Sequence, residues 1–129
     1  MKPIEKVLVI DDDPTSIYLT KRVLQSLNIT ESQTQAAFDG LEGLNLIKKA
    51  FEQKQLPQLI LLDIKMPVMD GFAFLEELVK LQNINLTDTK IILLSSSHNP
   101  WEVTRAQQSP IAAFLNKPLT KEKLQQVIS

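Results

Sequence analysis

The amino-acid sequence predicts an α/β fold, with a doubly wound parallel sheet of five strands covered by helices. Short apolar runs alternate with longer amphipathic segments along the whole chain. Continuous rather than alternating hydrophobicity is typical of strands that are buried on both faces, as in a parallel sheet. Right-handed crossovers then give an open sheet, because a closed eight-stranded barrel needs roughly twice this length.

The five strands are predicted where short, mainly apolar runs occur, at residues 6–10, 35–38, 59–62, 91–94 and 112–115. A helical pattern follows each run, so the chain has the order (βα)5. We expect the flavodoxin-like strand order 2-1-3-4-5, in which the first, third and fourth strands lie in the middle of the sheet.

The helices are predicted from apolar stripes and from capping residues. Three stripes have helical spacing: Leu41, Leu44, Ile47 and Phe51; Phe74, Leu75, Leu78 and Leu81; and Leu124, Val127 and Ile128. Asp13 before Pro14 is predicted to cap the first helix. Asn99 before Pro100 is predicted to cap the fourth, with Glu102 as the reciprocal capping partner. This fourth helix is short, with Val103 and Ala106 as its clear core residues, so it is a plausible moving part.

Length and composition exclude several classes of protein. The 129 residues are predicted to form a single domain, 1–129, and the formal net charge of −1 gives no basic surface for nucleic acid. The absence of cysteine excludes disulfides, thiolate zinc sites and cysteine nucleophiles. The start of the sequence lacks the apolar region of a signal peptide, and no apolar run is long enough to span a bilayer. We therefore expect a cytoplasmic protein with no membrane contact.

Polar residues stand directly after four of the predicted strands. Asp11 and Asp12 follow the first strand, Asp63 the third, Ser95 the fourth and Lys117 the fifth. Each of them alone would be an ordinary loop residue. Ligands of doubly wound sheets bind at the carboxyl edge of the strands, however, and these residues are expected to converge there. The sequence therefore favours a functional site at this edge.

The chemistry of these residues is consistent with phosphoryl transfer. Converging carboxylates repel one another unless a cation joins them, and oxygen ligands without histidine or cysteine favour Mg²⁺. A carboxylate can act as a nucleophile toward phosphorus, forming an aspartyl phosphate. Lys117 and the metal would neutralise the charge on the transferred group, and Ser95 could donate a hydrogen bond to it.

Four motifs together resemble the receiver domain of two-component response regulators of the chemotaxis-regulator type. They are VLVIDDDP, LILLDIKMPVMDG, ILLSS and FLNKP, and the resemblance extends from Val7 to Ile128. It implies that Asp63 is the phosphoacceptor, supplied by a phosphohistidine on a histidine kinase or a histidine phosphotransfer protein. It also implies that Mg²⁺ is held by Asp11, Asp12, Asp63 and the backbone carbonyl of Lys65.

The resemblance also implies a conformational change upon phosphorylation. Ser95 would move toward the phosphoryl group, Phe114 would turn inward, and Lys117 would contact the phosphate and precede a cis peptide bond at Pro118. The surface of the fourth helix, fifth strand and fifth helix would then change for a downstream target protein. Homodimerisation through that surface is a further expectation. The resemblance implies a phosphoprotein that assists its own phosphorylation and dephosphorylation, not an enzyme that turns over a separate substrate.

The sequence disfavours two other functions. A phosphate-independent interaction or dimerisation module is disfavoured, because the set Asp11, Asp12, Asp63, Ser95 and Lys117 is intact. A Mg²⁺-dependent phosphatase with an aspartate nucleophile would need a substrate-binding cap, for which this chain has no room. His98, the only histidine, is interpreted as a solvated loop residue, and Trp101 as either an exposed contact residue or part of the core.

Two residues depart from the commonest pattern of the family that the sequence resembles. The side chain of Lys65 could shield the phosphoryl group or interfere with attacking water, and so change the lifetime of the phosphate. Phe114 lacks the hydroxyl group of the tyrosine in many members, so a partner contact through that hydroxyl is absent.

Overall fold

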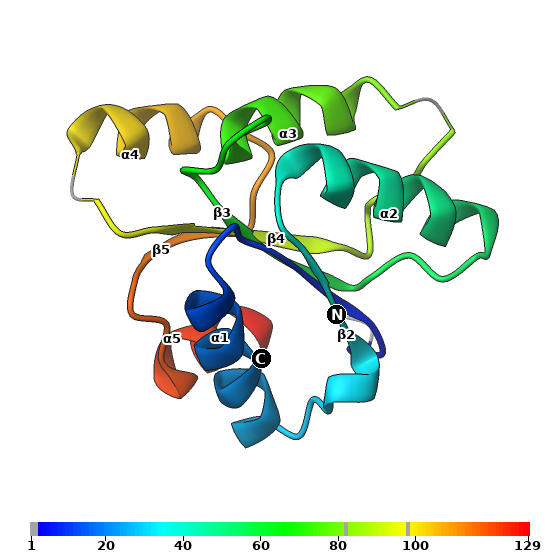
Figure 1. Ribbon diagram of the computed structural model, residues 1–129, viewed down its shortest axis with the longest axis horizontal. Coiled ribbons are helices and arrows are strands. Elements are labelled where there is room, and N and C mark those ends of the chain that lie inside the picture. Colours follow the sequence, from blue (N-terminus) through cyan, green and yellow to red (C-terminus); the bar gives the residue numbers. More distant parts are fainter. Residues whose placement is uncertain (1–2, 82, 98) are drawn as a thin grey trace.

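The computed structural model describes residues 3–81, 83–97 and 99–129, and its strands form one parallel sheet in the order β2–β1–β3–β4–β5 (Figure 1). The strands are β1 (Val7–Ile10), β2 (Thr34–Ala37), β3 (Leu59–Asp63), β4 (Lys90–Ser95) and β5 (Ala113–Asn116). The predicted fold class and strand order are confirmed, with each strand boundary within one residue of its predicted position.

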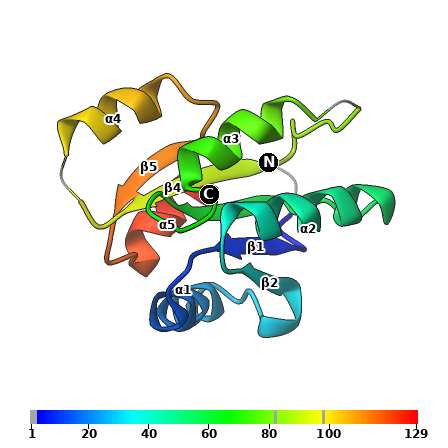
Figure 2. The ribbon, with the colours of Figure 1, turned by 45° about the horizontal axis from the view of Figure 1, so that its top comes forward.

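Helices cover both faces of the sheet, as Figures 1 and 2 show. The helices are α1 (Pro14–Ser26), α2 (Gly40–Glu52), α3 (Gly71–Val79), α4 (Pro100–Gln107) and α5 (Lys121–Ile128), with a short 3₁₀ helix at Glu31–Gln33. Helices α1 and α5 lie on one face, and α2, α3 and α4 lie on the other. Among the described residues, no helix combines the length and the apolar character needed to cross a membrane.

Each α-helix begins where a polar side chain accepts a hydrogen bond from its first turn. The capping residues are Asp13, Asp39, Asp70, Asn99 and Thr120. The predicted capping roles of Asp13 and Asn99 are confirmed. Asp13 accepts from the backbone N–H of Thr15 at 3.0 Å, which also fixes the chain as it leaves the end of β1.

The core has two parts, one on each face of the sheet, because the strands are apolar on both sides. Leu8, Ile10, Ile60, Leu62 and Leu93 point toward α2, α3 and α4. The alternate residues of β1, β3 and β4 pack with Leu24 of α1 and Leu124 of α5.

The predicted apolar stripes were wrong at several positions. In α2, Leu41 and Phe51 are exposed, while Leu44 and Ile47 are buried. Gly43 faces the sheet instead, and a Cβ atom there would lie 2.6 Å from the Ile10 side chain. The absence of a side chain at this position lets the helix approach β1 closely, so the buried face is shifted from the predicted stripe toward Gly40 and Gly43.

Two more positions differ because helices α3 and α4 are placed differently from the prediction. Leu81 lies beyond the end of α3 and only partly contacts the core. In α4, Val103 is 39% exposed, while Glu102 is buried together with Ala106. Residues four apart share a helix face, so α4 is rotated by about one residue relative to the prediction.

Val68, in the loop between β3 and α3, has a strained backbone. Its φ is 67°, and the N–H of Met69 donates to the carbonyl of Pro67 at 2.7 Å across it. Left-handed φ is unfavourable for a β-branched residue, and the Val68 side chain is exposed, so no packing compensates. We expect Val68→Asn to raise the free energy of unfolding by about 1 kcal/mol in urea denaturation, because asparagine tolerates this conformation.

The matched control for this prediction is Val79→Asn. Val79 is also an exposed valine but lies in α3. Valine and asparagine have similar helix propensities, so this change should stay within about 0.5 kcal/mol. Equal effects of the two substitutions would show that the φ of Val68 carries no appreciable strain.

Candidate functional site

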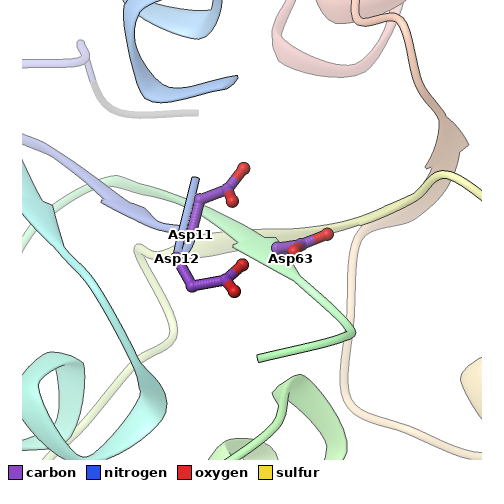
Figure 3. A group of neighbouring side chains, drawn as sticks. All are labelled: Asp11, Asp12 and Asp63. Carbon is purple, nitrogen blue, oxygen red and sulfur yellow. The ribbon is translucent and has the colours of Figure 1, made fainter. Parts of the chain in front are cut away.

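Three carboxylates meet at the carboxyl edge of the sheet. Asp11 and Asp12 follow β1, and Asp63 is the last residue of β3. Since β1 and β3 are neighbours with Ile10 opposite Leu62, the residues that follow these two are placed side by side. One oxygen of each carboxylate lies within 4.8 Å of the others, and Figure 3 shows the three side chains gathered at this edge. The structure thus brings the predicted acidic residues together.

Lys117 reaches this cluster from the loop after β5. Its Nζ lies 2.9 Å from Oδ2 of Asp11 and 3.3 Å from Oδ1 of Asp63. It also donates to Oγ of Ser16, in the first turn of α1, at 3.0 Å. Burial lowers the pKa of Lys117, but the hydrogen bonds and charges of Asp11 and Asp63 outweigh this, so the pKa is raised. The ammonium group therefore stays charged at neutral pH.

Asp63 is less acidic than an ordinary aspartate. Burial, followed by the negative charge of Asp11, raises its pKa from 3.8 to about 6, although Lys117 opposes the shift. Asp11 is more buried still, at 2% exposure, and its Oδ1 accepts from the N–H of Asp13 at 3.0 Å. One ammonium group thus does not fully balance the carboxylates of this cluster.

The donor set fits a magnesium ion. The ligand atoms at hand are carboxylate oxygens of Asp11, Asp12 and Asp63, and among the residues that the structure describes no histidine or cysteine joins the cluster. Mg²⁺ prefers such hard oxygen ligands and keeps several waters, which the exposed side of Asp12 allows. Lys65 lines the same open cleft of about 920 Å³, and its backbone carbonyl as a metal ligand stays a prediction.

Ser95 lies at the end of β4, as predicted, but its hydroxyl group is engaged away from the carboxylates. It donates to Oε1 of Glu102 in α4 at 2.8 Å. The predicted capping role of Glu102 was wrong. The side chain of Asn99 accepts from the N–H of Trp101, and the N–H of Asn99 itself donates to Oγ of Ser97. Glu102 instead lies on the buried face of α4, where Ser95 is within reach.

Phe114 and Trp101 occupy different environments near this edge. Phe114, in β5, is partly buried and packs against the core under α2, α3 and α4, opposite Leu93 of β4. Trp101 is 61% exposed, which decides between its two interpretations, and it contacts Phe72 edge to face. The peptide bond between Lys117 and Pro118 is cis. His98 lies outside the described residues.

Sequence reasoning missed Ser16 and Glu102. Ser16 is an ordinary polar residue in the first turn of a helix, and only the fold brings it to Lys117. Glu102 was predicted to be a capping residue, so its burial against the sheet was not predicted. The signal in the sequence was the small number of apolar residues in this helix, which leaves few other residues to cover the sheet.

Comparison with known proteins agrees with this geometry. The family model described as the response regulator receiver domain matches residues 7–129. The chain is 32% identical over 122 residues to the sensor histidine kinase CheAY of Helicobacter pylori, covering 95% of this chain and 14% of that protein. It is 32% identical over 123 residues to a probable chemotaxis protein CheY of Rhizobium etli, covering 95% of this chain and 88% of that protein.

A solved structure shows the same fold along nearly the whole chain. The two-component response regulator from Cytophaga hutchinsonii superposes with a TM-score of 0.85 at 26% identity, covering 98% of this chain and 95% of that one. Several of the curated relatives are much longer, and the chain spans 20% of the response regulator ARR10 of Arabidopsis thaliana.

Proposed function

The chain belongs to the response regulator receiver family, and we propose that it accepts a phosphoryl group on Asp63 from a phosphohistidine. The carrying observation is the placement of Asp63 beside Asp11, Asp12 and Lys117 at the carboxyl edge of the sheet. The open cleft in front of these residues leaves room for a phosphodonor. Receivers are signalling domains, so the expected output is a changed surface that a partner protein recognises.

The reaction follows from the groups in the cluster. An oxygen of the Asp63 carboxylate attacks phosphorus, the N–P bond of the phosphohistidine breaks, and its electron pair stays on the imidazole nitrogen. The ammonium group of Lys117, already 3.3 Å from Asp63, would lie beside the added negative charge. Mg²⁺, held by Asp11, Asp12, Asp63 and the Lys65 carbonyl, would supply further charge neutralisation and orient the phosphoryl oxygens.

The partners proposed are a histidine kinase or histidine phosphotransfer protein and a separate downstream target. The similarity to a protein named as a sensor histidine kinase supports the first. Ser95 and Phe114 are proposed to transmit the change to the surface of α4, β5 and α5. Homodimerisation through this surface stays a prediction.

The test is the intact mass of the protein after incubation with acetyl phosphate and Mg²⁺. We expect a gain of one phosphoryl group in the wild-type protein, and none in Asp63→Asn or in the metal-free sample. Asp70→Asn is a matched control, because Asp70 caps α3 close by in sequence and is not part of the acidic cluster. A folded wild-type protein that gains no mass would contradict the proposal and favour a phosphate-independent interaction module.

A further inference from the structure

Ser95 and Glu102 form a buried pair between the sheet and α4. The hydroxyl of Ser95 donates to Oε1 of Glu102 at 2.8 Å, and the two residues are 2% and 4% exposed. The same hydroxyl lies 3.1 Å from the carbonyl of Ser97 and accepts from the N–H of Ser97 at 3.0 Å. Ser95 is also fixed through its backbone, since its carbonyl accepts from the N–H of Lys117 at 2.7 Å.

A serine hydroxyl has a single proton to donate. In the structure, the nearest acceptor to the Ser95 hydroxyl is Oε1 of Glu102 at 2.8 Å, and the carbonyl of Ser97 lies farther away at 3.1 Å. A phosphoryl group on Asp63 could receive the proton only if Ser95 turned and gave up Glu102. Glu102 and a phosphoryl group on Asp63 would therefore compete for the same hydroxyl proton.

We propose that Glu102 is a positioning residue that holds Ser95 in the unphosphorylated arrangement and that phosphorylation releases α4 by taking this hydrogen bond away. The inference rests on the proposed function and adds a residue to it. It makes the Ser95–Glu102 hydrogen bond the connection between the phosphorylation site and the helix whose surface is expected to change.

The packing of α4 explains why loss of one hydrogen bond can change the position of this helix. Among the residues of α4, only Glu102 and Ala106 are buried. A carboxylate that loses its donor cannot remain buried without a large desolvation penalty, so Glu102 must move toward water. Since Glu102 lies in the first turn of α4, this turn and Trp101 beside it would move with it.

The experiment measures binding of beryllofluoride, a mimic of the phosphoryl group, in the presence of Mg²⁺, through the fluorescence of Trp101, the only tryptophan. In Glu102→Gln, Ser95 donates to a neutral amide rather than to a carboxylate. Hydrogen bonds to charged groups are stronger than neutral ones, so the unphosphorylated arrangement loses stability and beryllofluoride should bind roughly fivefold more tightly. In a Ser95→Ala background the same substitution should change affinity less than twofold.

Glu76→Gln is the matched control. Glu76 also contacts α4, through Arg105 at 2.9 Å, but it is exposed and does not touch Ser95. We expect it to change beryllofluoride affinity less than twofold. An equal effect of Glu76→Gln and Glu102→Gln would overturn the proposal, because general loosening of α4 would then explain both.

The possible failures are distinguishable. If the wild-type protein shows neither saturable beryllofluoride binding nor a gain of mass with acetyl phosphate, both the proposed function and the role of Glu102 are contradicted. If the wild-type protein binds and Glu102→Gln binds equally or more weakly, the role of Glu102 alone is overturned. Should the variant not fold, hydrogen exchange of the wild-type protein decides: the amides of residues 102–107 should exchange about tenfold faster with beryllofluoride, and unchanged exchange would overturn the proposal.

Discussion

Asp63→Asn is expected to raise the free energy of unfolding by about 2 kcal/mol in metal-free buffer at pH 8. Burial and the charge of Asp11 raise the pKa of Asp63 to about 6, so the ionised form is unfavourable in the folded protein. One pKa unit corresponds to about 1.4 kcal/mol, and the open side of the cleft reduces the effect below the full shift. Asparagine keeps the shape of the side chain and removes the charge.

The pH dependence follows from the sign of the shift. The folded protein binds more protons at Asp63 than the unfolded chain between pH 4 and pH 6, so wild-type stability falls as the pH rises through this window. Asp63→Asn cannot ionise and should lack this fall, so the two proteins should be almost equally stable near pH 4. Urea denaturation from pH 4 to pH 8 measures the difference directly.

The control for this prediction is Asp12→Asn. Asp12 belongs to the same cluster but is exposed, so its charge is solvated and its removal should stabilise the protein much less. Addition of Mg²⁺ should stabilise the wild-type protein more than Asp63→Asn, because the metal loses a ligand in the variant. A wild-type stability that stays flat from pH 4 to pH 8 would show that Asp63 is an ordinary aspartate.

The sheet and its acidic edge could be predicted from the sequence because strand hydrophobicity and strand order together determine them. Runs such as LILL at 59–62 have no polar side and are short, which favours a buried parallel strand. Once β1 and β3 are neighbours, Asp11 and Asp63 must lie close together. The capping roles of Asp13 and Asn99 could also be predicted from the sequence, because capping depends on residues only two or three positions apart.

Helix orientation and polar contacts between distant segments could not be predicted in the same way. A stripe at helical spacing leaves the rotation of a helix open by about one residue, which exposed Leu41 and Val103 and buried Glu102. The rotation of α2 depends on Gly43 packing against Ile10, a contact between two elements. The hydroxyl of Ser95 likewise has several acceptors within reach of its loop, and only the fold selects Glu102.

Lys117→Met is expected to lower the free energy of unfolding by roughly 2–4 kcal/mol in metal-free buffer at pH 8. Methionine has a similar length but no charge, so Asp11 and Asp63 would both lose their cation. The effect on Asp11 should be the larger one, because Asp11 is almost fully buried and would keep the hydrogen bond from the N–H of Asp13 but no cation. Removing one member of a buried ion pair leaves an uncompensated charge, which is more costly than replacing the pair.

The loss should be smaller at pH 5 than at pH 8. Without Lys117, the pKa of Asp63 would lie above its wild-type value of about 6, because the lysine lowers it. At pH 5 the carboxyl group of Asp63 would therefore be mostly protonated, and loss of the lysine would leave less uncompensated negative charge in the cluster than at pH 8. Mg²⁺ at pH 8 should restore part of the lost stability, since it can replace the missing positive charge between the carboxylates.

Lys121→Met separates this effect from a general loss of positive charge. Lys121 is exposed at the start of α5, four residues after Lys117, and its replacement should change stability by less than about 0.5 kcal/mol. If Lys117→Met were no more damaging than Lys121→Met at pH 8, water in the cleft would already compensate the carboxylates. The raised pKa of Asp63 and the stability gain in Asp63→Asn would then have to disappear as well, so the two substitutions test one electrostatic description of the site from opposite directions.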